Sequence, residues 1–176
     1  ENPELWMAIM EKLTTNLIYH AQQQIAAGCE VIQIFESWAQ AISKTDYQQF
    51  VLPYTQRLIA SINEKAPTIL FGSFSGDKLD LQKASGASCL SLFWNVSTDD
   101  VAKTFESSQP IQGNLDPVLL FCKPRIFLPF VKKILDAWGP RGNFIFNLGH
   151  GILPETPVNH ALALVDYVHA YKFPSL

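Results

Sequence analysis

The sequence predicts an α/β protein whose strands run parallel, in a barrel of alternating strands and helices. Two observations support this fold class. Five short apolar segments alternate along the chain with segments of helical pattern, and no tight hairpin turn joins two strands. Polar and glycine-containing motifs follow the apolar segments directly, where α/β proteins place their binding groups. At 176 residues the chain is long enough for one domain, so we expect a single α/β domain over residues 1–176.

The first expected element is a long helix that ends near residue 27. Asn2 is a typical N-cap, Pro3 suits the first helical position, and Gly28 suits the end of a helix. An apolar residue at every fourth position predicts one amphipathic stripe along this helix. Its members are Leu5, Ile9, Leu13, Leu17, Ala21 and Ile25.

The five apolar segments are predicted as strands. They are apolar almost throughout, which is typical of parallel strands that are covered on both faces. The predicted strands are residues 31–35, 68–71, 89–94, 110–112 and 143–146. Helical patterns follow at residues 46–64, 77–85, 99–107, 117–138 and 157–171, and Pro124 should break the fourth of them.

An open doubly wound sheet and a closed barrel both contain such strands. The segment after the first strand, Phe35-Glu36-Ser37-Trp38, lacks the glycines of a phosphate-binding turn, which disfavours a nucleotide-binding sheet. Polar motifs at the ends of several strands favour the catalytic face of a barrel. A complete barrel of eight units needs roughly 250 residues. We therefore expect a (β/α)₈ TIM-type barrel, represented here by roughly its last five βα units.

Composition excludes several classes of partner. The net charge of −3 gives no reason to expect nucleic acid or an anionic membrane, and no apolar run is long enough for a transmembrane helix. The three cysteines, Cys29, Cys89 and Cys122, are widely separated in apolar surroundings. We interpret them as reduced core residues of a cytoplasmic protein.

Four separated motifs resemble those of uroporphyrinogen decarboxylase in order and spacing, over essentially the whole chain. They are Ile34-Phe35-Glu36-Ser37-Trp38; Tyr47-Gln48-Gln49-Phe50 with Leu52-Pro53-Tyr54; Gln112-Gly113-Asn114-Leu115-Asp116-Pro117; and Asn147-Leu148-Gly149-His150-Gly151. The resemblance implies a (β/α)₈ barrel, commonly a homodimer, in haem and tetrapyrrole biosynthesis. It also implies removal of carbon dioxide from the four acetate arms of uroporphyrinogen III to give coproporphyrinogen III, without a cofactor or metal.

The resemblance assigns substrate binding to three residues. Ser37 matches a position that hydrogen-bonds a substrate carboxylate, His150 matches a second substrate-binding position, and Phe35 matches a residue of the same pocket. The family's arginine pair, its aspartate at the pyrrole nitrogens and its substrate-binding tyrosine match nothing here and are expected before Glu1. No catalytic residue is therefore expected within this chain, which alone should be inactive. The chain departs from the family at Phe93, where an aspartate usually precedes Trp94.

Taken without the resemblance, each of these residues also fits a structural role. Ser37 could cap a turn, and His150 could bond a local carbonyl. Asp116 is expected to start a helix, and Asn114 to tie down a loop through side-chain to backbone bonds. Glu36 is assigned a structural hydrogen-bonding role, because a carboxylate facing an acidic substrate would repel it.

Two other classes of function stay open at this point. Zinc-dependent methyltransferases of the same superfamily need a thiolate-containing site, typically with His-x-Cys, and no histidine here has a cysteine two residues later. A half-barrel could also be a non-catalytic binding module. A barrel that lacks its first units has two open sheet edges, at Val31–Phe35 and Asn143–Phe146. Because their backbone groups are unpaired, we expect these edges to bind the amino-terminal barrel segment or a second copy of the chain.

Overall fold

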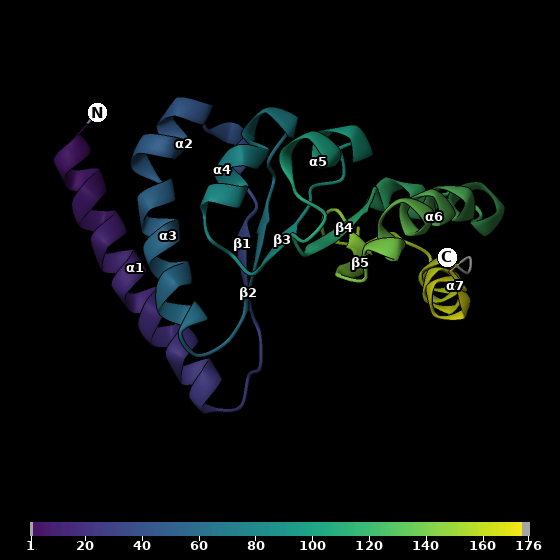
Figure 1. Ribbon diagram of the computed structural model, residues 1–176, viewed down its shortest axis with the longest axis horizontal. Coiled ribbons are helices and arrows are strands. Elements are labelled where there is room, and N and C mark those ends of the chain that lie inside the picture. The colour runs from purple at the N-terminus through teal and green to yellow at the C-terminus, as the bar shows by residue number, and fades with distance from the viewer. Residues whose placement is uncertain (1, 174–176) are drawn as a thin grey trace. The chain divides into compact units, whose positions relative to one another are not determined.

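The computed structural model describes residues 2–173 and shows five strands with helices between them (Figure 1). The strands are β1 (Ile32–Glu36), β2 (Thr68–Gly72), β3 (Cys89–Ser91), β4 (Ile111–Leu115) and β5 (Phe144–Leu148). They belong to one parallel sheet in the order β1-β2-β3-β4-β5. The predicted parallel α/β fold is therefore confirmed.

The helices also follow the predicted order. They are α1 (Pro3–Ala26), α2 (Lys44–Phe50), α3 (Leu52–Asn63), α4 (Leu79–Ala84), α5 (Thr98–Thr104), α6 (Pro124–Trp138) and α7 (Val158–Ala170), with short 3₁₀ helices η1 (Ala39–Ala41), η2 (Gly76–Lys78), η3 (Pro117–Phe121) and η4 (Gly139–Arg141). The predicted break at Pro124 is confirmed. The single helix predicted over 46–64 is wrong: α2 ends at Phe50 and α3 begins at Leu52, beside Pro53.

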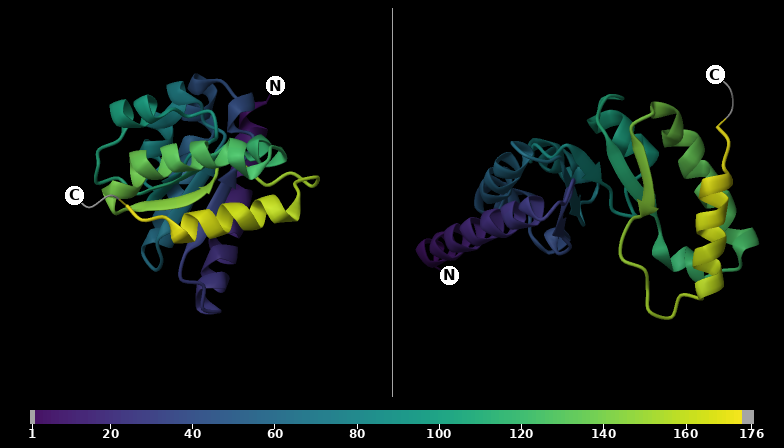
Figure 2. Two further views of the ribbon diagram at one scale, coloured as in Figure 1. Left: turned by 90° about the vertical axis from the view of Figure 1, so that its right-hand side faces the viewer. Right: turned by 90° about the horizontal axis from the view of Figure 1, so that it is seen from below.

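Contacts within the chain form two compact units, Glu1–Leu90 and Ser91–Leu176. The prediction of a single domain over residues 1–176 stays a prediction. In the first unit, α1 and α3 lie side by side (Figure 1), and Ala21, Leu58 and Ile62 form a buried cluster with Ile32 of β1. In the second unit, α6 and α7 pack beside β5 (Figure 2) around a cluster that includes Phe127, Val131 and Leu164.

The predicted stripe of α1 is largely wrong as a buried face. Leu5, Ile9, Leu13 and Leu17 are about half exposed, whereas Thr14 and Ala21 are buried. A helix turns about 100° per residue, so a side chain at every fourth position drifts by about 40° each time. The stripe therefore winds around the helix, and only its last members, Ala21 and Ile25, reach the first unit's core.

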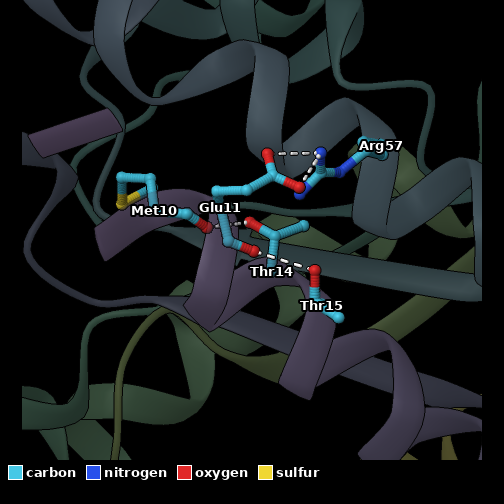
Figure 3. Close-up of polar contacts among 5 residues, drawn as sticks. All are labelled: Met10, Glu11, Thr14, Thr15 and Arg57. Carbon is cyan, nitrogen blue, oxygen red and sulfur yellow. Dashed lines mark hydrogen bonds and ion pairs between the residues drawn. The ribbon is translucent and has the colours of Figure 1, made fainter. Parts of the chain in front are cut away.

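Polar contacts add to the packing between α1 and α3 (Figure 3). Arg57 of α3 donates from Nη1 to both carboxylate oxygens of Glu11, at 2.9 and 2.7 Å. Thr14 and Thr15 donate back to carbonyls one turn earlier, which satisfies their hydroxyls inside the helix. Both charged side chains are well exposed, and such surface pairs typically contribute about 1 kcal/mol or less. The apolar cluster therefore holds the two helices together, and the ion pair contributes little.

Three predicted strand boundaries are corrected. β3 ends at Ser91 rather than at residue 94, while β4 and β5 extend past their predicted ends to Leu115 and Leu148. Gly113, Asn114 and Asn147 are therefore strand residues, with Asn114 opposite Asn147 in the ladder. Because a ladder uses backbone groups, polar and glycine residues can continue a strand that the apolar pattern predicts to end.

The cysteines differ in their surroundings. Cys89 is buried in β3, and burial raises the pKa of its thiol to about 11. Cys122 is partly buried, but Cys29 is exposed, so the expectation of three core cysteines is wrong for Cys29. It lies between Gly28 and β1, in a segment that carries no core contact in the first unit's apolar cluster. Among the described residues, no helix is both long enough and apolar enough to cross a bilayer.

Candidate functional site

The carboxyl end of β1 carries two of the predicted substrate-binding residues. Side chains alternate along a strand. Ile32 and Ile34 pack on the cluster formed by α1 and α3, whereas Phe35 contacts Phe71 of β2, ring centre to ring centre at 5.9 Å, and is 67% exposed. Ser37 follows directly and is partly buried. Phe35 therefore lies on the face of the sheet that these helices do not cover.

A cavity of about 320 Å³ adjoins this strand end. It is lined mainly by α1, α3 and the loop after β1, and Phe35, Glu36 and Ser37 border it at the strand end. Its surface is mainly apolar side chain, with a few polar groups from the end of β1. An apolar hollow with few polar groups is typical of small-molecule sites.

Glu36, between Phe35 and Ser37, also borders the cavity, and its carboxylate points toward the helices. Its carboxylate accepts hydrogen bonds from Tyr47 Oη of α2 and Thr55 Oγ1 of α3, each at 2.5 Å. Burial raises the pKa of this carboxyl above its usual value of 4.5, and the two hydrogen bonds partly offset that rise. Burial and the neighbouring carboxylate also raise the pKa of Tyr47. The expectation of a structural hydrogen-bonding role for Glu36 is confirmed.

This raised pKa predicts a pH dependence of stability. A carboxyl that binds its proton more tightly when folded makes the native state hold more protons than the unfolded state, so stability falls as the pH rises through that window. We therefore expect the free energy of unfolding of the wild type, measured in urea, to fall relative to that of Glu36→Gln as the pH rises from about 4.5. A difference that stays constant with pH would contradict the assignment.

The loop after β1 is held from β2 and its following turn. Ser73 Oγ accepts a hydrogen bond from Gln40 N at 3.0 Å. The buried Lys78 donates from Nζ to the carbonyls of Ala39 at 3.2 Å and Ile42 at 2.5 Å. A buried ammonium group is costly unless hydrogen-bonded, so these carbonyls are the reason that Lys78 can lie inside. The loop is thereby fixed at three backbone positions.

In the second unit, Asn114 and Gly113 hold the end of β4. Asn114 is buried and donates from Nδ2 to the carbonyls of Phe93 and Val96, both at 2.9 Å. Gly113 has φ +129°, and an added Cβ would lie 3.1 Å from Leu92 O, so the position requires glycine. Asp116 caps η3 through Val118 N at 2.9 Å. The predicted roles of Asn114 and Asp116 are confirmed.

Gly149 joins the ends of three segments in the second unit. Its N–H donates to Leu115 O at 2.8 Å, and its carbonyl accepts from Trp94 N at 3.1 Å. A Cβ at this position would lie 2.4 Å from Trp94 N. His150 follows, is exposed, and its ring meets Phe93 edge-on at 5.9 Å. Phe93 thus packs its aromatic ring against His150.

The three predicted substrate-binding residues lie at the ends of two strands, one in each unit. The structure brings Phe35 and Ser37 to one cavity in the first unit, and it places His150 at the end of β5 in the second unit. Sequence reasoning missed Lys78, and it found no partner for Glu36. A buried lysine between η2 and α4 gives no signal in the sequence, because its partners are backbone carbonyls.

Comparison with known proteins defines the class first. A methyltransferase from Methanosarcina mazei superposes with a TM-score of 0.73 at 22% identity, over 88% of this chain and 46% of that one. A Yersinia pestis DHPS superposes with a TM-score of 0.55 at 16% identity, over 88% of this chain and 61% of that one. At these identities the similarity establishes the fold alone. The fold is that of a TIM-type α/β barrel, of which the described residues form five strands.

The family follows from sequence. The model of the family described as uroporphyrinogen decarboxylase (URO-D) matches residues 1–171. The uroporphyrinogen decarboxylase of Geotalea daltonii is 41% identical over 168 residues, which are 95% of this chain and 49% of that protein. The one from Carboxydothermus hydrogenoformans is 39% identical over 170 residues, 96% of this chain and 49% of that protein. This chain belongs to the uroporphyrinogen decarboxylase family, and it spans about half the length of the curated relatives it matches.

Proposed function

We propose that the protein containing this chain decarboxylates the four acetate arms of uroporphyrinogen III to give coproporphyrinogen III in haem and tetrapyrrole biosynthesis. The observation that carries the proposal is the family match over residues 1–171, which includes all four motifs of the resemblance. In this proposal Ser37, His150 and Phe35 bind the substrate, and this chain supplies only part of the active site.

The proposed residues suit a large, polyanionic, aromatic-like substrate. The hydroxyl of Ser37 and a ring N–H of His150 can each donate a hydrogen bond to a carboxylate, and such bonds to charged groups are stronger than neutral ones. Phe35 presents an exposed aromatic face that can pack on a pyrrole ring. Decarboxylation needs the pyrrole carbon to be protonated, so that the ring accepts the electron pair of the breaking C–C bond. A nearby carboxylate would stabilise the cation that develops.

That stabilising carboxylate and the clamp for the substrate's acidic arms would come from outside this chain. Arginine is the residue best suited to hold carboxylates by paired hydrogen bonds. Arg57 already binds Glu11, and Arg141 donates to the carbonyls of Glu106 and Gln109. Arg125 lies at the start of α6. We therefore propose that the upstream barrel units supply the aspartate and the arginines.

The remaining features of the proposal follow the family resemblance. The intact protein would be a cytoplasmic homodimer that needs neither cofactor nor metal. A methyltransferase function is not proposed, because the similarity to the Methanosarcina mazei methyltransferase establishes the fold alone.

Substitution of histidines tests the proposed binding role. In the full-length protein, His150→Ala should raise KM for uroporphyrinogen about tenfold or more, because it removes a donor to a charged carboxylate. His169→Ala, at an exposed position of α7, is the matched control and should leave KM within about twofold. His160→Ala is less suitable, because His160 Nδ1 bonds Leu120 O at 2.8 Å and the change would also affect packing. Equal effects of His150→Ala and His169→Ala would refute the role of His150.

A further inference from the structure

Glu36 lies between the two proposed substrate contacts of the first unit, and all three residues border the same cavity. Phe35 is on the sheet face away from α1 and α3, and Ser37 is the first residue beyond the strand. Glu36 instead reaches into the helix layer, where Tyr47 and Thr55 donate to its two carboxylate oxygens. We propose that Glu36 is a positioning residue, which aims Ser37 at the substrate by anchoring the end of β1 to α2 and α3.

The alternation of a strand gives this anchor its effect. Successive side chains point to opposite faces, so fixing one of them in the helix layer sets the direction of its neighbours. Tyr47 Oη donates to Oε2 and Thr55 Oγ1 donates to Oε1. The carboxylate therefore bridges two helices and cannot rotate without losing a hydrogen bond. Tyr47 is itself fully buried and packs edge-on against Phe74, at 5.1 Å between ring centres. The anchor is therefore attached to a rigid part of the first unit.

The backbone at the same point is held from the neighbouring strand. The carbonyl of Glu36 accepts from Ser73 N at 3.2 Å, and Ser73 Oγ accepts from Gln40 N. Lys78 fixes the carbonyls of Ala39 and Ile42 further along the loop. Ser37 thus lies between an anchored strand end and an anchored loop. Loss of the Glu36 contacts would free the strand end on the Ser37 side and leave the far end of the loop in place.

A positioning role predicts a specific pattern of kinetics in the full-length protein. Ser37→Ala should raise KM for uroporphyrinogen about tenfold with kcat nearly unchanged, because a hydrogen bond to a charged group is lost. Glu36→Ala should raise KM by a similar factor. If Glu36 acts through Ser37, the double variant should show no more than about twofold beyond Ser37→Ala alone, since coupled residues give non-additive effects. Glu36→Gln keeps an amide oxygen that accepts one hydroxyl, so its KM should stay within about threefold.

Controls separate positioning from loss of the fold. Glu30→Ala, exposed just before the other end of β1, should leave KM and kcat unchanged. If Glu36→Ala does not fold, Thr55→Val and Tyr47→Phe each remove one bond to the carboxylate. Each of these two variants should raise KM less than Glu36→Ala does. Neither should raise KM further when it is combined with Ser37→Ala. Effects of Glu36 and Ser37 substitutions that multiply, or a Glu36→Ala variant with lower stability and unchanged KM, would overturn the proposal.

A second measurement does not depend on activity. This inference rests on the proposed function, and an inactive wild-type protein would refute that function without touching the anchor. Hydrogen exchange of peptides covering Ser73 tests the anchor directly, because the Ser73 amide donates to the carbonyl of Glu36 at the end of β1. The amides of Gln40 and Ile42, at the far end of the loop, provide the internal control. Exchange at Ser73 should be faster in Glu36→Ala than in the wild type and unchanged in Glu30→Ala. Equal exchange in all three proteins would contradict the anchoring role of Glu36.

Discussion

Residues 1–176 alone are expected to form no detectable coproporphyrinogen from uroporphyrinogen. The proposed reaction needs a carboxylate that stabilises the protonated pyrrole and cationic groups that hold the acidic arms. Loss of a single stabilising donor typically costs about 10²–10³ in rate, and here several groups would be lost together. Arg57 and Arg141 are already hydrogen-bonded within their own units, and Arg125 lies at the start of α6.

The measurement compares the purified chain with the full-length protein at equal concentration. Products are oxidised to porphyrins and separated by their number of carboxyl groups. Adding the upstream segment as a separate polypeptide provides the complementation control, and some activity should return if the two pieces associate. Turnover by residues 1–176 alone at a rate near that of the full-length protein would show that the catalytic groups lie within this chain.

Gly149→Ala is expected to destabilise the second unit by about 3 kcal/mol, at the upper end of the usual range for overpacking. The added methyl would lie 2.4 Å from Trp94 N and 2.5 Å from Trp94 Cα, which are backbone atoms that cannot rotate away. The same residue makes backbone hydrogen bonds to Leu115 and Trp94, so any shift that relieves the clash weakens these bonds. Urea unfolding, followed by tryptophan fluorescence, measures the loss.

Gly151→Ala provides a matched control two residues away. No atom lies within 4 Å of a Cβ at Gly151, so this change should alter the unfolding free energy by less than about 1 kcal/mol. Gly149 and Gly151 both adjoin His150, so each variant adds one methyl group next to the same residue and the two are directly comparable. Equal stability of the two variants would show that the Gly149 backbone is not in close contact with Trp94.

The alternation of apolar and helical segments was sufficient to predict the parallel α/β fold and the order of its elements. The motifs that follow the strands also predicted polar residues at the carboxyl ends of individual strands, where parallel strands leave binding groups. The boundaries were less predictable. Gly113, Asn114 and Asn147 continue their strands, since backbone pairing does not depend on apolar side chains.

Two other features could not be read from the sequence, for different physical reasons. Apolar residues at every fourth position of α1 do not stay on one face, because the pattern rotates slowly around the helix. Most of these residues are therefore exposed. The anchor of Glu36 depends on Tyr47 and Thr55, which are eight residues apart on two different helices. No local pattern brings them together, because the break between α2 and α3 decides where each hydroxyl points.

Product analysis of the full-length protein tests the central claim most directly. The protein is incubated anaerobically with uroporphyrinogen III, and the oxidised products are separated by carboxyl count over time. We expect four carboxyl groups to be lost, with coproporphyrinogen III as the final product, and slower conversion by the His150→Ala and Ser37→Ala variants at low substrate concentration. Substrate that keeps all its carboxyl groups in the presence of folded wild-type protein would contradict the proposed function.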